Sequence, residues 1–437
     1  MRKPMSFARW LLGYEGIPYM SRPTIRWELL STFFLTMGAS VVVPQFTTLF
    51  VKLSLFSDLS KQQQQAWDYA LPLLVTEIAA GNLLASFLAR YFQSWRRVPL
   101  IVWSRLLIAA AMLGIAFLPV SSHSIVPFAL LLCLPAFAMG INLNVRASVL
   151  HSNFPPELRG RIFSRLFIVG LATTAISIRG TGEVLDHWPQ AHHVLYPLGA
   201  LSVVISALFY RRIRVRWERS MLREQAKQPV RLLAGLRLLK TDRVYGRFML
   251  WQLLSGASVM MASSLSPLLL KEYFDVDYGR GTTSLVVVPL GVALMTVPLS
   301  GRLFDTIGIT RFRAVNAALW ATSRVILFFS FAFRCWPGVL AGFAMQGLGQ
   351  SLGGMAYNIG HTRFSHPKDS HVYMGLHMTF QGIRGLIAPF LGMALYKTPD
   401  IGIYILPLCA ATQYVAAVGF FFSPAPREPS PLEKRST

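Results

Sequence analysis

The sequence predicts an all-α integral membrane protein in which twelve transmembrane helices form two pseudo-symmetric bundles of six. Hydrophobic residues make up 53% of the 437 positions and charged residues only 14%. The apolar residues occur in continuous blocks of about twenty, the length that crosses a hydrocarbon core as a helix. Such runs exclude the alternating pattern of a membrane β-barrel. The two halves also repeat short sequences, and basic residues gather in alternate loops.

Twelve apolar blocks follow one another, and each can span a bilayer as a helix, which satisfies its backbone hydrogen bonds internally. They are centred on residues 29–53, 69–92, 98–119, 125–145, 162–185, 194–210, 248–270, 284–304, 315–333, 336–359, 374–396 and 401–422. The expected parts of the chain are an N-terminal segment 1–26, a first bundle 27–210, a basic linker 211–247, a second bundle 248–422 and a tail 423–437.

Two of the polar segments have apolar residues that fit surface helices. The N-terminal segment 1–26 is expected to be either a short amphipathic helix on the inner membrane surface or an unstructured basic tail. In the linker, apolar residues recur at helical spacing over 230–239, which predicts a second helix along the membrane surface.

The second half of the chain repeats three short sequences of the first half in the same order. They are Gly-Ala-Ser-Val at 38–41 and 256–259, Ser-Arg at 104–105 and 323–324, and Phe-Ala-Met at 137–139 and 343–345. Many transporters use duplicated spans to build a central site between two halves that rock against each other. The repeats therefore indicate an internal duplication into two bundles.

The net charge of +23 follows membrane topology rather than nucleic-acid binding. With the N-terminus placed in the cytoplasm and the sides alternating, 32 of the 42 Lys and Arg residues fall in cytoplasmic segments. This asymmetry is the positive-inside rule, which predicts cytoplasmic termini and an external loop at 54–68. We therefore expect a multi-pass protein of the cell inner (cytoplasmic) membrane, surrounded by the lipid bilayer and without a nucleic-acid partner.

The segment between the eighth and ninth blocks reads GRLFDTIGITR at 301–311. It resembles the Gly-x-Leu-x-Asp-x-x-Gly-x-x-Arg signature of the major facilitator superfamily of secondary transporters. In that family the signature helps to hold one conformation and release it, so the resemblance implies a gating role for Gly301, Asp305, Gly308 and Arg311. The residues alone also suggest this, since glycines permit a tight turn and close helix approach, and Asp305 can pair with Arg311 or Arg313.

Two further segments can be compared with the same family. The sequence PPELRGR at 155–161 is similar to its Pro-x-x-x-Arg-Gly-Arg stretch, although a basic inner loop with a proline turn gives the same pattern. The first-half loop equivalent to 301–311 has Ala85 and Ala89 in place of the Gly and Asp, so no matching gate is expected there. Through its twelve-span plan the resemblance covers essentially the whole chain and implies the fold of this family.

Ionisable side chains at bilayer depth are costly and usually face a cavity or a partner. At ~1.5 Å rise per residue, Arg384 lies ~15 Å into the eleventh span, near the midplane, and Glu77 lies ~12 Å into the second span. Arg384 predicts a cationic site for a solute that bears a carboxylate or a phosphate. For Glu77 two interpretations stay open, a site for a coupling proton or an ion-pair partner of a span arginine.

The other span arginines favour a structural interpretation. Arg105 is expected to reach the inner headgroups, Arg179 to pair with Glu183 four residues on, and Arg324 to snorkel or pair internally. Uncharged polar residues give a weaker signal, because Asn142, Gln346 and Gln350 fall in helices that line the family's cavity. They predict either substrate contacts or hydrogen bonds between closely packed helices.

The sequence carries no signature of an enzyme or of an ATP-driven pump, since no nucleophile elbow, phosphate-binding loop or paired catalytic carboxylates appear. No cofactor is predicted. Four histidines cluster in one loop region, but their spacing does not bring metal ligands together, so no metal site is predicted; they are His361, His366, His371 and His377.

These observations predict a secondary active transporter that moves a small solute, with an organic anion as the first choice, by rocker-switch alternating access. A coupling proton or ion and a monomeric state are expected. The alternative within the class is an exporter of amphipathic drug-like compounds. The alternative from another class is a membrane receptor or scaffold that has the fold but does not transport.

Overall fold

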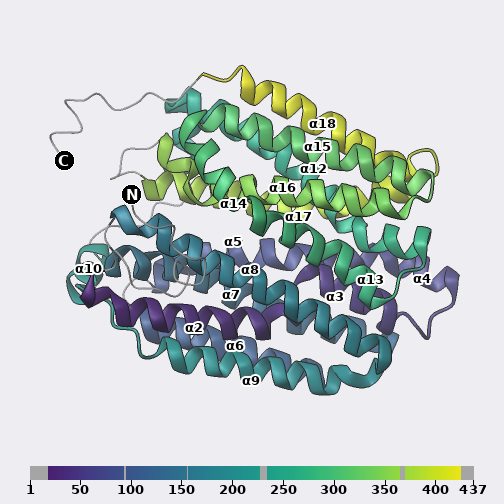
Figure 1. Cartoon of the computed structure of the whole chain (residues 1–437), viewed down its shortest axis with the longest axis horizontal. Helices are drawn as coiled ribbons and strands as arrows, with labels where there is room; N and C mark the ends of the chain where they lie inside the picture. The colour runs from purple at the N-terminus through teal and green to yellow at the C-terminus, as the bar shows by residue number, and fades with distance from the viewer. Residues whose placement is uncertain (1–17, 93–94, 155, 227–233, 365–369, 425–437) are drawn as a thin grey trace, which may run out of the picture.

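The computed structural model describes residues 18–92, 95–154, 156–226, 234–364 and 370–424 (Figure 1). These residues are mostly helical, and none of them forms a β-strand. The all-α fold class predicted from the apolar blocks is therefore confirmed. The N-terminal surface helix predicted in 1–26 lies largely outside the described residues, as does most of the tail 423–437.

The helices form two bundles joined by a linker. The first bundle contains α2 Arg22–Ala39, α3 Pro44–Phe50, α4 Lys61–Trp67, α5 Leu71–Phe92, α6 Arg97–Ala116, α7 Ile125–Asn153, α8 Pro156–His187 and α9 His192–Tyr210. The linker contains α10 Glu218–Ala226 and α11 Ala234–Thr241. The second bundle contains α12 Arg243–Phe274, α13 Tyr278–Thr282, α14 Val288–Thr306, α15 Ile309–Ala332, α16 Trp336–Ile359, α17 Ser370–Lys397 and α18 Ile405–Phe421.

The long helices of both bundles run roughly along the long axis of the molecule (Figure 1). Helix α10, the first turn of α2 and the last turn of α18 lie at one end, which we call the linker end. Helices α4 and α13 lie at the opposite end, which we call the far end. The described chain therefore enters and leaves the bundles at the same end, as an even number of crossings requires.

Ten helical segments of the described chain are long and apolar enough to cross a membrane. The predicted second and tenth spans are also helical, as α5 with 22 residues and α16 with 24 residues, but they are not among those ten. Helix α16 is rich in glycine and glutamine, which lowers its mean hydropathy although it packs between α14 and α15. The number of twelve spans remains a prediction.

The first predicted span is a broken helix. Helix α2 ends at Ala39, and Val43 is extended (φ −75°, ψ 135°) before α3 begins at Pro44. Proline lacks an N–H and disfavours helical backbone in the residue before it, which accounts for the break. Just before it, Gly38 lets α2 approach α9, since a Cβ there would lie 2.3 Å from the carbonyl oxygen of Gly199.

The described apolar core joins the two bundles at the far end. One cluster of buried side chains combines Leu49 and Phe50 of the first bundle with Leu268 and Leu269 of the second. Towards the linker end the clusters are separate, and each belongs to one bundle. Among the described residues, the apolar cluster that the two bundles share therefore lies at the far end, where hydrophobic burial, the main favourable term in packing, holds them together.

Polar contacts also cross between the bundles at the far end. The buried Asp68 carboxylate accepts hydrogen bonds from Lys52 of its own bundle (2.6 Å) and from Lys397 at the end of α17 (2.7 Å). The hydroxyls of Ser54 and Tyr278 lie 2.5 Å apart. The Asp186 carboxylate of α8 accepts the backbone N–H of Tyr278 (2.8 Å). These contacts tie the bundles together at the far end.

Closer to the middle, the bundles meet where α17 packs on α5. A Cβ at Gly385 would lie 2.2 Å from the Cβ of Ala79, and one at Gly382 would lie 2.9 Å from Leu83. Only glycine allows this approach without displacing α5. The contact places the part of α17 that carries Arg384 next to the boundary between the two bundles.

Candidate substrate site

Arg384 lies in α17 and faces α12 of the same bundle. Its side chain is almost buried, with 9% of the residue exposed, and Nη1 donates a hydrogen bond to the backbone oxygen of Gln252 (2.7 Å). The guanidinium lies directly on Gly256, where a Cβ would come within 2.1 Å of Cζ. The glycine of the second Gly-Ala-Ser-Val repeat therefore provides the space that Arg384 occupies.

The surroundings of Arg384 are polar but carry no described counter-charge. Tyr357 of α16 lies within electrostatic range, and Gln381 lies one turn earlier on α17. Three buried polar atoms here have no hydrogen-bond partner among the described residues. They are Nε of Arg384 and the side-chain oxygens of Gln252 and Gln381. A guanidinium with unused donors fits a carboxylate or phosphate, which accept in the same fork geometry.

The arginine of each repeated Ser-Arg pair donates hydrogen bonds to neighbouring helices of its own bundle. Arg105 is fully buried, donates to Ser31 and to both oxygens of Ser206, and lies 4.3 Å from the Tyr210 ring centroid. The expectation that Arg105 reaches the inner headgroups is therefore wrong. Depth alone suggested that route, but the hydroxyls of α2 and α9 offer a closer partner.

Arg324 has the corresponding role in the second bundle. It is 1% exposed, and its two terminal nitrogens donate to Gln346 (3.2 Å) and to Ser263 (3.0 Å). The i, i+4 ion pair of Arg179 with Glu183 is present on α8, so that prediction is confirmed. Of Arg105, Arg179, Arg324 and Arg384, Arg384 is the most exposed after Arg179 and, like Arg179, has a single described partner.

The uncharged polar candidates make contacts between helices. The amide of Asn142 donates to the hydroxyl of Ser104 (2.9 Å), and Gln346 accepts from Arg324. Both residues are buried. Gln350 lies one turn after Gln346 and is half-buried. The structure therefore gives Asn142 and Gln346 the interhelical hydrogen bonds that were the alternative to substrate contacts.

Glu77 lies in α5 on the side that packs against α7. Close contact between these helices is possible because Gly81 approaches Ala136, where a Cβ would lie 2.4 Å from the backbone carbon. The Glu77 carboxyl lies within electrostatic range of Cys133 of α7, and its buried Oε1 has no hydrogen-bond partner among the described residues. No ion pair with Arg384 is present in the described part of the chain.

The turn between α14 and α15 contains the residues predicted to form a gate. Gly308 has φ of 72°, a left-handed conformation that glycine adopts without strain, and α15 begins at the next residue. Gly301 packs near Met355, since a Cβ at this glycine would lie 3.3 Å from the methionine methyl carbon, and Arg311 is exposed. The side chain of Asp305 lies outside the described side chains. Arg313 instead donates to Asn316 (2.8 Å).

The sequence did not predict two buried carboxylates, those of Glu28 and Asp68. Arg146 donates to buried Glu28 through Nε (3.0 Å) and Nη2 (2.8 Å), and Asp68 binds two lysines at the far end. Glu28 and Asp68 lie just outside the apolar blocks 29–53 and 69–92, so the blocks gave no sign that their side chains are buried. Their burial follows from helices that extend beyond the blocks. The histidines at 361, 366 and 371 lie outside the described side chains.

Comparison with known proteins identifies the fold family. A model described as the Major Facilitator Superfamily matches residues 29–389. The chain belongs to the major facilitator superfamily. None of the curated proteins matches the chain by sequence. The family assignment confirms the resemblance that was based on residues 301–311.

Solved structures of this superfamily share the fold. A crystal structure of a D-xylose–proton symporter superimposes with a TM-score of 0.72 at 14% identity, covering 92% of this chain and 97% of the other. The partially occluded inward-open xylose transporter XylE from E. coli gives 0.71 at 10% identity, covering 94% and 100%. The nucleoside transporter NupG gives 0.66 at 14% identity, covering 91% and 99%. The chain is a multi-pass membrane protein with a non-enzymatic transporter fold.

Proposed function

We propose that this superfamily member is a secondary active transporter of a small organic anion. It would act as a monomer in the cytoplasmic membrane, with its two bundles opening alternately to either side. The observation that carries the proposal is Arg384, a nearly buried cation in α17 with an unused buried donor and no described acidic partner. A buried positive charge at this depth is costly unless a negative charge offsets it. An anionic solute would supply that negative charge.

The comparison with the other arginines strengthens this assignment. Arg105 and Arg324 are closed off by hydroxyl, amide and aromatic neighbours, at 0% and 1% exposure, whereas Arg384 keeps 9%. Arg179 has its own carboxylate partner. Of these side chains, Arg384 alone combines depth, residual access and spare donors. We assign Gln252, Tyr357 and Gln381 as further polar groups of the same site.

The contacts between bundles support alternating access. They gather at the far end, where Asp68 joins Lys52 and Lys397, and the apolar clusters separate towards the linker end. If the linker end is cytoplasmic, as the positive-inside rule predicts, this conformation is closed to the outside. We propose that Asp305 and Arg311, with Gly301 and Gly308, form the gate at the linker end.

For energy coupling we propose a proton carried by Glu77. Its carboxyl lies at mid-span depth, is nearly buried, and has no hydrogen-bond partner among the described residues for Oε1. A carboxyl in such a place binds and releases protons as its exposure changes, because burial disfavours its charged form. Symporters of D-xylose and protons have the same fold, which is consistent with this proposal.

A ligand screen tests the class of substrate. Purified protein would be heated with matched sets of carboxylates, phosphate esters, neutral sugars and nucleosides, and amphipathic cations. A ligand that binds the folded state raises its melting temperature by mass action, and we expect shifts with anions only. Shifts with amphipathic cations would favour the drug exporter, shifts with sugars alone would refute the anion site, and no shift with any set would favour the non-transporting scaffold.

A further inference from the structure

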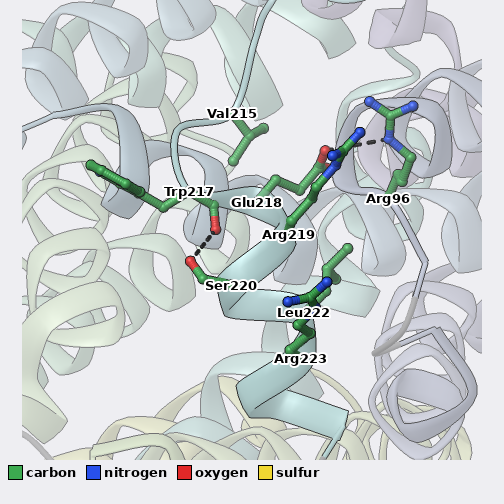
Figure 2. A pocket seen from close by; sticks show the side chains of 8 residues that line it. All are labelled: Arg96, Val215, Trp217, Glu218, Arg219, Ser220, Leu222 and Arg223. Atoms are coloured by element: carbon green, nitrogen blue, oxygen red, sulfur yellow. Dashed lines mark hydrogen bonds and ion pairs between the residues drawn. The ribbon is translucent and has the colours of Figure 1, made fainter.

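A basic groove lies at the linker end, between α10 and the start of α6. Its volume is about 940 Å³. Figure 2 shows its walls, which come from the turn before α6 and from α10 with the residues leading into it. The lining side chains are Arg96, Val215, Trp217, Glu218, Arg219, Ser220, Leu222 and Arg223. Three arginines against one glutamate give the groove a positive charge.

Glu218 fixes the position of this groove. Its carboxylate accepts the backbone N–H of Arg97 (2.8 Å), the first residue of α6, and pairs with Nε of Arg96 (3.4 Å). A carboxylate at a helix N-terminus is favoured by the helix dipole. Glu218 therefore anchors the start of α10 to the start of α6. Because Glu218, the acidic residue of the groove lining, makes these contacts, its charge is directed at Arg96 and the start of α6.

Arg219 and Arg223 are left without a counter-charge among the described residues. Both are exposed, and they lie four residues apart on α10, so they occupy the same face one turn apart. Like charges at this spacing weaken a helix, and a helix of nine residues has little stability of its own. A bound anion between the two guanidinium groups would remove this repulsion.

The level of the groove along the bundle indicates the source of the anion. The groove adjoins the start of α6 and the segment after α9, where the apolar part of the bundle ends. Trp95 and Trp217 are exposed there by 52% and 80%, and tryptophan is enriched at the boundary between bilayer and water. Trp217 has φ of 56°, which bulky residues rarely adopt, and its backbone oxygen accepts a hydrogen bond from the Ser220 hydroxyl (2.9 Å).

We propose that this groove binds the headgroup of an anionic phospholipid from the adjoining leaflet. The phosphate would lie between Arg219 and Arg223, the indole of Trp217 would lie at the level of the headgroups, and Leu222 would contact the upper acyl chain. Occupation would stabilise α10 and, through Glu218, the position of the linker relative to α6. Anionic lipids attract basic residues at such membrane surfaces, and here the fold presents two of them at fixed spacing.

Native mass spectrometry of the detergent-purified full chain tests this site. The protein would be titrated with phosphatidylglycerol, and separately with phosphatidylcholine, to obtain the dissociation constant of the first bound lipid. Each arginine near an anionic lipid contributes on the order of a five-fold gain in binding. The double variant Arg219→Gln/Arg223→Gln is therefore expected to bind phosphatidylglycerol about 25-fold more weakly.

Two matched variants make the result decisive. Arg211→Gln/Arg214→Gln removes the same charge from exposed positions next to the groove and should bind the lipid as the unchanged protein does. Arg219→Lys/Arg223→Lys keeps the charge and should retain most of the binding. Equal weakening in both glutamine variants would overturn the site, as would equal affinity for phosphatidylcholine. If inorganic phosphate displaces the lipid at equal concentration, the ligand is free phosphate and the lipid assignment is wrong.

Discussion

The sequence placed Arg105, Arg179, Arg324 and Arg384 deep in the apolar spans, and their neighbours give them different roles. Arg105 and Arg324 donate to hydroxyl and amide oxygens of adjacent helices, and Arg179 pairs within its own helix. Arg384 donates only to one backbone oxygen among the described groups. Its Nε has no described partner, which is also true of Nε in Arg105 and Arg324. The sequence predicted the depth of all four, because depth follows from position along a helix. It also predicted the partner of Arg179, which lies four residues further along the same helix. It could not predict the partners of the other three, which depend on the direction in which each side chain leaves its helix.

Gly256 gives a residue-level test of the site. In Gly256→Ala the added methyl would overlap the guanidinium of Arg384, which lies within 2.1 Å of the Cβ position. We expect a loss of roughly 1–3 kcal/mol in stability, typical of overpacking, and at least ten-fold weaker anion binding. Thermal denaturation and a ligand titration would measure these. Gly180→Ala is the control, since nothing lies within 4 Å of its Cβ position; the same binding loss there would contradict the explanation.

Glu77 and Arg384 should act independently on stability. The structure shows no ion pair between them in its described part, and Glu77 lies towards α7. Residues without shared contacts have additive effects within about 0.3–0.5 kcal/mol. A double-mutant cycle with Glu77→Gln and Arg384→Gln should therefore show a coupling below that limit in unfolding free energy. A coupling of more than about 1 kcal/mol would return Arg384 to a structural role as the partner of Glu77.

At the scale of helices, the apolar blocks predicted where the spans lie but not how they end or break. Pro44 carried the signal for the break in the first span, since proline cannot continue a helix from the preceding residue. Helices α7 and α12 extend several residues beyond their apolar blocks, because helical hydrogen bonding continues outside the bilayer. The packing of α17 on α5 depends on Gly382 and Gly385, and sequence alone does not identify which helix a glycine faces.

Asp68 tests the contact between the bundles. Asp68→Asn removes the buried charge that joins Lys52 to Lys397, and leaving buried cations unpaired is strongly unfavourable. We expect the far end to open, which distance measurements between spin labels at positions 61 and 400 would report as a longer separation. Asp58→Asn is the control, because Asp58 bonds only to Ser122 within its own bundle in the described structure. Unchanged distances in Asp68→Asn would show that this triad does not hold the far end closed.

At the scale of the whole molecule, the charge distribution predicts which end faces the cytoplasm. The described chain enters and leaves the bundles at the linker end (Figure 1), which agrees with termini on one side, and the basic linker sets that side. A cysteine placed at Ser220, which is exposed on α10, should react with membrane-impermeant reagents only in opened cells. Labelling from outside intact cells would reverse the assignment of inside and outside.

The overall architecture was the most predictable feature, because hydropathy, charge and internal duplication all follow from composition along the chain. The family signature at 301–311 added the fold, and the family match confirmed it. The proposed substrate site was less predictable, since Arg384, Gln252 and Tyr357 come from three helices that are distant in sequence. Their proximity arises only when α12, α16 and α17 pack together.

The central claim is that Arg384 binds the anionic group of the solute. Isothermal titration with an anion from the ligand screen should show about 10–150-fold weaker binding in Arg384→Gln, as expected when a hydrogen bond to a charged group is lost. Arg384→Lys should recover part of it, because lysine keeps the charge but lacks the fork of donors. Arg179→Gln should bind as the unchanged protein does. If folded Arg384→Gln binds the anion with undiminished affinity, the account is wrong.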